Sequence, residues 1–167
     1  FKLAGSTFSY GITGTFSDYT AEYTKCDNPT GLIGDPYVGK RLGEIWGYKV
    51  GGLFRTDEEA AEYASRIDYR TVAPGYYSST GEYGKGVRAG DVIYLDLDGN
   101  NIINGGKGTL DDTGDRRIIG NSQPRYQYGA TVNFSWYGFD VSVFVQGIGR
   151  QDWYPGADNL RFWGPYS

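Results

Sequence analysis

Residues 7–17 alternate strictly between apolar and small polar positions. Phe8, Tyr10, Ile12, Gly14 and Phe16 fall on one side, and the residues between them are Thr, Ser and Gly. A period of two is typical of a β-strand, because successive side chains point to opposite faces. The pattern therefore predicts a strand over residues 7–17, with one apolar face and one uncharged polar face.

The same alternation recurs twice near the other end of the chain. Residues 125–136 place Tyr126, Tyr128, Ala130, Val132, Phe134 and Trp136 on one face, and residues 139–147 place Phe139, Val141, Val143, Val145 and Gly147 on one face. Only Phe144 interrupts the pattern, because it falls among the polar positions. The link Trp136-Tyr137-Gly138-Phe139 is short and contains Gly, so it predicts a tight hairpin between these two strands.

The length and the polar faces of these strands favour a membrane setting. Strands in soluble sheets average about 5–6 residues, whereas a strand that crosses a bilayer needs about 9–11. Aromatic residues close the apolar faces, as in the girdles of outer-membrane barrels: Phe8 and Phe16 on the first strand, Tyr126 and Trp136 on the second. The pattern indicates an all-β fold, with a section of a large antiparallel transmembrane β-barrel favoured over a soluble sandwich.

Composition removes several classes of chemistry. Among 167 residues there are 27 Gly, 17% aromatic residues, one Cys and no His or Met. Without His there is no His-based catalytic triad and no His-ligated metal, and Cys26 cannot form a disulfide within the chain. A net charge of −4 with a pI near 4.8 argues against nucleic acid as a partner. No secretory leader or apolar run long enough for a membrane helix is present. Because the chain begins at Phe1 and has no Met, we expect it to be part of a longer polypeptide.

Residues 18–124 hold most of the charge and many turn signals. Thr56 and Glu59 form a capping box, which predicts a helix over residues 57–66. In an outer-membrane barrel the short turns are periplasmic and the long loops are extracellular. We therefore expect a barrel strand within residues 1–24, an extracellular loop region over 25–124, a barrel hairpin over 125–150 and the start of the next extracellular loop over 151–167.

An acidic stretch over residues 91–115 has the spacing of a calcium loop. Positions 1, 3 and 5 of an EF-hand-type loop correspond to Asp96, Asp98 and Asn100, position 7 (a backbone carbonyl) to Ile102, apolar position 8 to Ile103, and position 9 to Asn104. Position 12 should be an acid and is Lys107, and position 6 should be Gly and is Asn101, which tolerates a left-handed backbone. Asp111, Asp112 or Asp115 could supply the missing acid, and the alternative is a β-turn with solvated acids.

No catalytic site is predicted. Asp96 with Asp98, or Asp111 with Asp112, could form an acid–base pair, but neither a nucleophile motif nor a nucleotide-binding fingerprint accompanies them. Short Asp-rich turns are more often metal loops or solvated turns, so we expect a protein that is not an enzyme.

Longer strings of the sequence resemble the SusC/RagA-type TonB-dependent transporters of Bacteroidetes. The strings are Gly90-Asp-Val-Ile-Tyr-Leu-Asp-Leu-Asp-Gly99, Gly114-Asp-Arg-Arg-Ile-Ile-Gly-Asn-Ser-Gln-Pro-Arg-Tyr126, the two strands after it, and Gly43-Glu-Ile-Trp-Gly-Tyr48 with the later Gly52-Leu-Phe54. The likeness runs along nearly the whole chain.

The resemblance implies a large outer-membrane barrel, 22-stranded in this family, with a plug that is not in this chain. It implies import of oligosaccharides or peptides beneath a SusD-like surface lipoprotein, powered through the plug by the TonB complex. This chain would be a section from the C-terminal portion of the barrel, with the rest of the barrel as its neighbour. The alternative function is a soluble all-β module for binding or adhesion, stabilised by calcium.

The resemblance also bears on the ligands of the acidic loop. It implies a Ca²⁺ site formed by Asp96, Asp98, Asn100, Ile102, Asn104 and Asp115. Asp115 would be the closing acid, although it lies eight residues past the usual position (115 against 107). The longer loop must therefore fold back to bring Asp115 to the others.

Aromatic residues of the loop region are candidates for stacking against sugar rings. They are Trp46, Tyr69, Tyr76, Tyr77 and Tyr83. The alternative is that these rings pack the inside of the loop region or contact a partner protein.

Overall fold

The computed structural model describes residues 7–69, 71–72 and 86–154. Their contacts divide them into two compact units. The strand unit contains the described parts of 1–21, 41–43 and 121–167, and the loop unit contains those of 22–40 and 44–120. Over these residues the structure is mostly β-sheet with one helix, so the all-β prediction is confirmed at that level.

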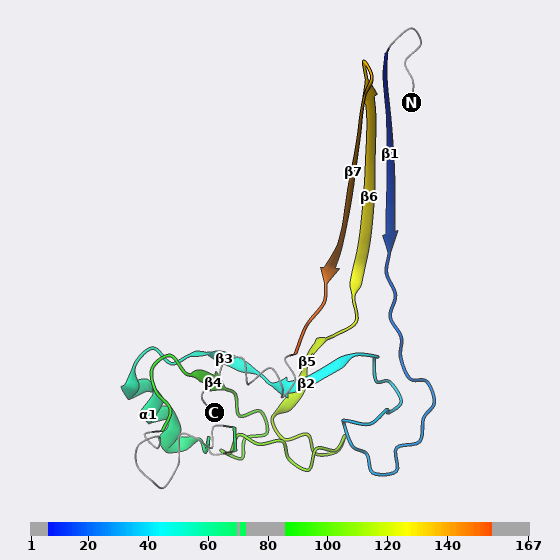
Figure 1. Cartoon of the computed structure of the whole chain (residues 1–167). Coiled ribbons are helices and arrows are strands. Elements are labelled where there is room, and N and C mark those ends of the chain that lie inside the picture. Colours follow the sequence, from blue (N-terminus) through cyan, green and yellow to red (C-terminus); the bar gives the residue numbers. More distant parts are fainter. Residues whose placement is uncertain (1–6, 70, 73–85, 155–167) are drawn as a thin grey trace, which may run out of the picture. The chain divides into compact units, whose positions relative to one another are not determined.

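Three long antiparallel strands form the sheet of the strand unit (Figure 1). They are β1 (Phe8–Ser17), β6 (Arg125–Trp136) and β7 (Phe139–Arg150), in the order β1-β6-β7. All three were predicted from alternation alone, and the third continues past its predicted end to Arg150. Because β6 is central, β1 and β7 are the edges of the sheet within the described part of the chain.

A two-residue turn joins β6 to β7, as predicted. Tyr137 has a φ of 46° and Gly138 a φ of 83°. Two central residues with positive φ are the mark of a primed hairpin turn, whose twist matches that of the flanking strands. This turn fixes the register in which Trp136 lies opposite Phe139.

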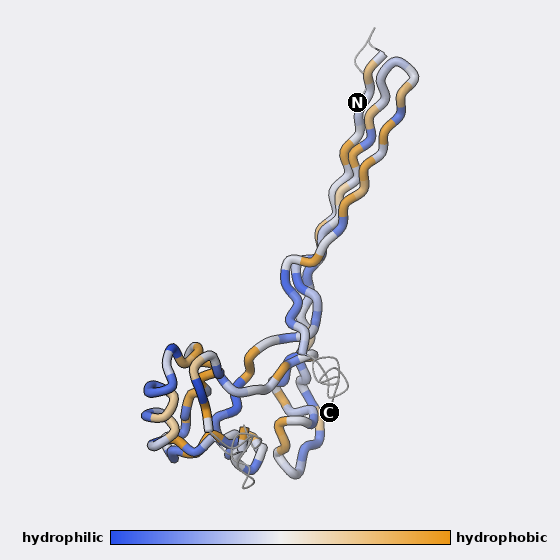
Figure 2. Tube along the Cα trace, turned by 60° about the vertical axis from the view of Figure 1, so that its left-hand side comes forward, coloured by the Kyte–Doolittle hydropathy of each residue, from blue (hydrophilic) through white to orange (hydrophobic). Residues whose placement is uncertain are grey.

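The register aligns apolar residues with apolar residues across all three strands. The rows on this face are Phe8–Trp136–Phe139, Tyr10–Phe134–Val141, Ile12–Val132–Val143, Gly14–Ala130–Val145 and Phe16–Tyr128–Gly147. The alternation is visible as orange segments separated by paler ones along the strands (Figure 2). Tyr126, the residue predicted to close this face, has a φ of 56°, so the regular pleat ends one step earlier, at the row that pairs Phe16 with Tyr128. Aromatic residues therefore occupy the first and the last row.

Two arginines lie directly opposite each other where β6 begins and β7 ends. Arg125 pairs in register with Arg150, and like charges in this position destabilise a sheet. Asp18, just beyond β1, accepts two bonds from the Arg125 guanidinium at 2.5 and 2.7 Å. Asp152 lies 3.4 Å from Arg150, and its Oδ2 also accepts the backbone N–H of Asn121. The two aspartates thus compensate the charge of the two arginines.

The loop unit contains short strands that the sequence analysis left as loop. β2 (Glu44–Tyr48) pairs with β5 (Arg116–Asn121), and β3 (Val50–Leu53) pairs antiparallel with β4 (Val92–Tyr94). A bulge between Val50 and Gly52 interrupts the second pair. The loop region is therefore an ordered domain-like unit in its described residues, as a connection of this length requires.

Helix α1 (Asp57–Arg66) begins and ends where the capping box predicts. The backbone N–H of Glu59 donates to Thr56 Oγ1 at 3.2 Å. The Glu59 carboxylate accepts from the backbone N–H of Arg55, one residue before the usual partner. Among the described residues, no helix combines the length and the apolar character that crossing a bilayer requires.

A small aromatic core holds the loop unit together. Its buried members are Phe54, Ala60, Ile67, Tyr69, Val87 and Ile103. Ala60 comes from the inner face of α1, and Ile103 comes from the acidic loop, where an apolar anchor was predicted at position 8. The core therefore attaches the helix and the acidic loop to one another.

Candidate functional site

The acidic loop folds as a chain of side chain to backbone hydrogen bonds. Asp96 accepts the backbone N–H groups of Gly99 and Asn101, at 2.8 and 2.9 Å. Asp98 accepts the N–H of Asn100 at 3.0 Å, and Asn100 in turn accepts the N–H of Ile102 at 2.7 Å. Each acceptor thus lies at an alternate position of the turn, so these oxygens converge on its inner side.

Asn101 supplies the sharp bend of the loop. It has a φ of 62°, the left-handed backbone that position 6 of a calcium loop requires. Asn adopts this conformation more readily than most residues, because its short polar side chain bonds locally. Asn101 therefore has the backbone conformation for which Gly is usual at this position.

Asp115 is fully buried at the base of the loop. Its Oδ1 accepts the backbone N–H groups of Leu97 at 2.6 Å and Asp98 at 3.4 Å, and its Oδ2 accepts that of Asn104 at 2.9 Å. A buried carboxylate needs such donors, because it leaves water on folding. Asp115 therefore lies beside the turn, despite its distance in sequence.

Residues 105–114 form an excursion from the acidic loop. At its two ends the backbones of Gly106 and Gly114 lie close together. Gly106 and Gly114 have φ values of 54° and 52°, and a Cβ on Gly114 would overlap the Gly106 backbone nitrogen. The backbone N–H of Asp115 donates to Asn104 O at 2.9 Å and closes the base of this excursion. The extra residues are thus looped out, and Asp115 returns to the turn that holds Asp96 and Asp98.

Three carboxylates meet as a result. One oxygen from each of Asp96, Asp98 and Asp115 lies within 4.8 Å of the others. Asn100, Asn104 and the Ile102 carbonyl belong to the same turn: Asn104 Nδ2 donates to Ile102 O at 3.1 Å, and Asn104 Oδ1 accepts from Gly106 N at 2.6 Å. Carboxylate, amide and carbonyl oxygens are the ligands of Ca²⁺ and Mg²⁺. Each carboxylate oxygen offers more than one lone pair, so bonds to N–H groups leave capacity for a cation.

Of the two other acids that could have closed the loop, Asp112 has a structural role and Asp111 is exposed. Asp112 Oδ1 accepts the N–H of Gly114 at 3.3 Å, and Asp112 exchanges backbone hydrogen bonds with Thr109 inside the excursion. Asp111 is exposed. Of the three acids that could have closed the loop, the structure places Asp115 with Asp96 and Asp98.

The negative charge of the loop reaches the neighbouring core. Burial raises the pKa of the Tyr63 hydroxyl, and the charges of Asp96 and Asp115 raise it further. Tyr63 donates its hydroxyl proton to Tyr94 O at 2.7 Å, which suits a phenol that stays protonated. The acids of the loop therefore lie close enough to Tyr63 of α1 to disfavour its ionisation.

The structure corrects one of the aromatic candidates for sugar stacking. Tyr69 is only 1% exposed, its hydroxyl hydrogen-bonds to the backbone of Val92 and Tyr94, and its ring packs among other core rings, so the prediction is wrong for Tyr69. Tyr69 packs in the core of the loop unit because its ring contacts other buried rings and its hydroxyl has backbone hydrogen-bond partners there. Trp46 is half-buried in β2. Tyr76, Tyr77 and Tyr83 lie outside the described residues.

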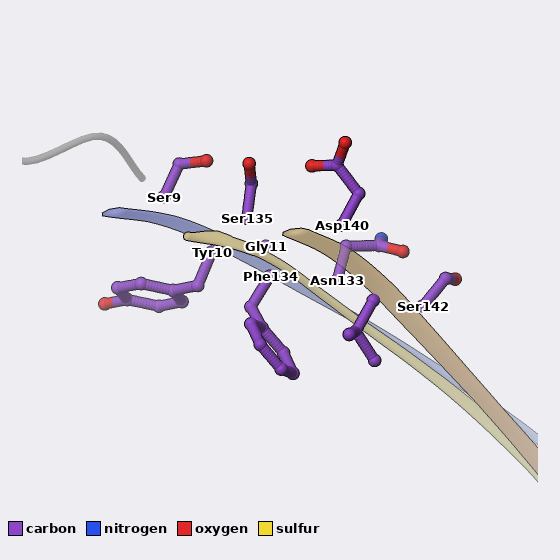
Figure 3. A pocket seen from close by; sticks show the side chains of 9 residues that line it. Ser9, Tyr10, Gly11, Asn133, Phe134, Ser135, Asp140 and Ser142 are labelled. Atoms are coloured by element: carbon purple, nitrogen blue, oxygen red, sulfur yellow. The ribbon is translucent and has the colours of Figure 1, made fainter. Parts of the chain in front are cut away.

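The polar face of the long sheet is a second candidate surface. Near the β6–β7 turn, Ser9, Ser135, Asp140, Asn133 and Ser142 point to one side of the sheet, and Tyr10 and Phe134 point to the other (Figure 3). A shallow groove of about 230 Å³ follows these strands. In the regular rows of this face Asp140 is the one charged side chain, and the pair Arg125–Arg150 lies just beyond those rows.

Comparisons of the chain with protein-family models and with curated proteins found no match. We therefore infer function from the geometry of the acidic loop and of the long sheet.

Proposed function

We propose that this chain is part of a TonB-dependent transporter of the bacterial outer membrane. The observation that carries the proposal is the long sheet, with one continuous apolar face and one polar face whose only charged side chain in the regular rows is Asp140. The strands contain 10, 12 and 12 residues, which suits the roughly 9–11 that a tilted strand needs to cross a bilayer.

The exposure of the apolar face supports a lipid environment. Ile12, Phe16 and Phe139 are 69%, 69% and 72% exposed, and exposed residues of this size extend along all three strands. A soluble sandwich would bury such a face against a second sheet, and no described element covers it. The aromatic rows at both ends match the girdles that lie at the two membrane interfaces.

The connections between the strands support one orientation in the membrane. The two-residue turn at Tyr137 and Gly138 suits the periplasmic side, and residues 25–124 then belong on the extracellular side. On that side a SusD-like lipoprotein would contact them. The free edges of β1 and β7 would pair with other strands of the barrel, and a plug elsewhere in the protein would couple transport to the TonB complex. Oligosaccharides or peptides would pass along the polar face.

Adjacent residues on opposite faces of β6 test the membrane setting. In a Cys26→Ser background, Val132→Cys and Thr131→Cys would each carry a fluorescent label, in protein reconstituted into lipid vesicles. We expect a quencher attached to lipid tails to act on position 132, and iodide in the aqueous phase to act on position 131. Val143→Cys and Phe144→Cys on β7 form a matched second pair with the same assignment.

Equal access of iodide to both positions of each pair would contradict the proposal. Release of the protein from membranes by carbonate alone would also contradict it and would favour a soluble calcium-stabilised binding module. Neither result would bear on the calcium site proposed for the acidic loop.

We propose that the acidic loop binds Ca²⁺ through Asp96, Asp98, Asn100, Asn104, Asp115 and the carbonyl of Ile102. The support is the return of Asp115 to within 4.8 Å of Asp96 and Asp98, with hard oxygen donors on the same turn. A bound cation would offset the mutual repulsion of the three carboxylates and stabilise the loop unit.

Calcium titration followed by calorimetry and thermal unfolding tests this site. We expect calcium to release or absorb heat and to raise the melting temperature of the unmodified protein. Asp96→Ala/Asp98→Ala should abolish both effects, whereas Glu58→Ala/Glu62→Ala, which removes two acids from α1, should retain them. If the Asp double variant responded to calcium as the unmodified protein does, the site would be wrong.

A further inference from the structure

Phe144 is the one aromatic residue on the polar face of the regular sheet. It lies opposite Thr131 in the register, while its neighbours Val143 and Val145 belong to the apolar face. Its side chain is 63% exposed. A large ring among hydroxyls and amides has no core to pack into, so its position calls for a reason other than packing.

The sheet makes room for this ring. Gly129 lies diagonally across from Phe144, and a Cβ on Gly129 would come to 3.9 Å from Phe144 Cε2 and 2.9 Å from Thr15 Oγ1. The ring therefore lies beside the one polar-face position of the middle strand that lacks a side chain. Most of the Phe144 side chain is exposed.

A groove of about 560 Å³ runs beside the ring. Side chains of the polar face that line it are Thr15, Ser17, Gln127, Phe144, Gln146 and Ile148. None of the residues lining this groove is charged. The two amides provide both donors and acceptors, and the hydroxyls provide either.

We propose that this groove binds a neutral sugar ring of the transported molecule. Phe144 would stack against the apolar C–H face of the sugar, while Gln127, Gln146 and Thr15 would hydrogen-bond to its hydroxyls. A sugar has an apolar face and a polar rim, which is the combination the groove presents. A charged peptide would meet no opposite charge there. The inference rests on the proposed transport function, and it favours oligosaccharides over peptides as the cargo.

Calorimetric titration of the detergent-purified protein tests the proposal. The probes are uncharged hexose oligosaccharides of several linkages, and lysine- and glutamate-containing tetrapeptides as comparison. We expect Phe144→Ala to weaken binding of the oligosaccharide that binds best by about tenfold, which corresponds to about 1.4 kcal/mol, because the variant removes the stacking surface. Phe144→Trp, which keeps a stacking surface, should bind about as tightly as the unmodified protein.

Val143→Ala is the matched control, because it shortens the adjacent side chain on the opposite face of the same strand. It should leave oligosaccharide affinity unchanged. Equal affinity of the unmodified protein and Phe144→Ala would overturn the sugar site, as would binding of the tetrapeptides but of no oligosaccharide. If the lipid-tail and iodide quenchers still separate positions 132 and 131 in protein reconstituted into vesicles, only the sugar site has failed. If they do not, the transporter proposal has failed.

Discussion

Single residues decide whether the end of the long sheet holds together. Asp18 neutralises Arg125, which lies directly opposite Arg150. Its two bonds to Arg125 are the main reason that the pKa of Asp18 falls from 3.8 to about 2. A carboxyl whose pKa is lower in the folded state stabilises that state above its unfolded pKa, and the contribution is lost as the pH falls through the folded pKa.

We therefore expect Asp18→Asn to lower the free energy of unfolding at pH 5–7, and the difference from the unmodified protein to vanish as the pH approaches about 2. Denaturant titrations at several pH values would measure this. Arg125→Gln is the partner variant in a double-mutant cycle. A difference between Asp18→Asn and the unmodified protein that stayed constant down to pH 2 would contradict the ion pair as its cause.

Gly114 is the residue on which the return of Asp115 depends. Its φ is 52°, and an added Cβ would lie 2.6 Å from Asn104 O and overlap Gly106 N, both of them backbone atoms. We expect Gly114→Ala to destabilise the loop unit by about 2 kcal/mol or more and to weaken its response to calcium.

Gly108→Ala is the control that separates the cost of a positive φ from the cost of steric overlap with the backbone. Gly108 has a similar φ of 69° and lies in the same excursion, but its added Cβ would only touch Arg116 at 4.0 Å. It should cost about 1–2 kcal/mol, with calcium binding retained. Equal loss of calcium binding in both variants would show that the close approach of Gly106 and Gly114 is not what positions Asp115.

Among the elements, α1 depends on its first turn. Thr56 Oγ1 accepts the N–H of Glu59, and Ala60 beside it is fully buried in the core. We expect Thr56→Ala to lower the free energy of unfolding of the loop unit by about 1 kcal/mol, measured by urea titration followed by circular dichroism. Thr56→Ser keeps the acceptor and should be close to neutral. An unchanged midpoint in Thr56→Ala would mean that the cap contributes nothing.

The elements also show what a sequence pattern can and cannot predict. β1, β6, β7 and α1 were predictable because each signal is local: nine or more residues of alternation, or a capping box. β2 and β5 carry no such pattern. They form because they pair with each other, although they lie far apart in the sequence. The residues of β2 are all half-buried, so they do not alternate between a buried and an exposed face.

The candidate metal site likewise has one part that local sequence predicts and one part that depends on distant contacts. The spacing of the polar residues was enough to predict the turn from Asp96 to Asn104. Asp115 was expected only by resemblance, because spacing alone left three acids open. The path that brings it back runs through Gly106, Gly114 and the pairing of Leu32 with Thr109, contacts that no local window contains.

At the scale of the whole molecule, the two units are stabilised by different means. The loop unit has a buried aromatic core, whereas the strand unit exposes its apolar side chains along a sheet. The mean hydropathy of −0.50 averages these two regions and describes neither. Each unit should therefore respond to a different change in its surroundings.

We expect chelation of calcium to lower the melting temperature of the loop unit and to leave that of the strand unit unchanged. Trp46 in β2 and Trp136 in β6 report on the two units separately, so single-tryptophan variants followed by fluorescence would resolve them. Changing the detergent should shift the Trp136 signal instead. A single transition with the same calcium dependence at both tryptophans would contradict independent stabilisation.

The open edges of the long sheet have a consequence for biosynthesis. β1 and β7 each have one side without a strand partner in the described part of the chain, beside a wide apolar face. In water, such a sheet is a template for pairing with other chains and for amyloid-like aggregation. A cell that makes this chain needs to keep these strands apart from one another until they reach a bilayer, so its synthesis should depend on an escorting chaperone.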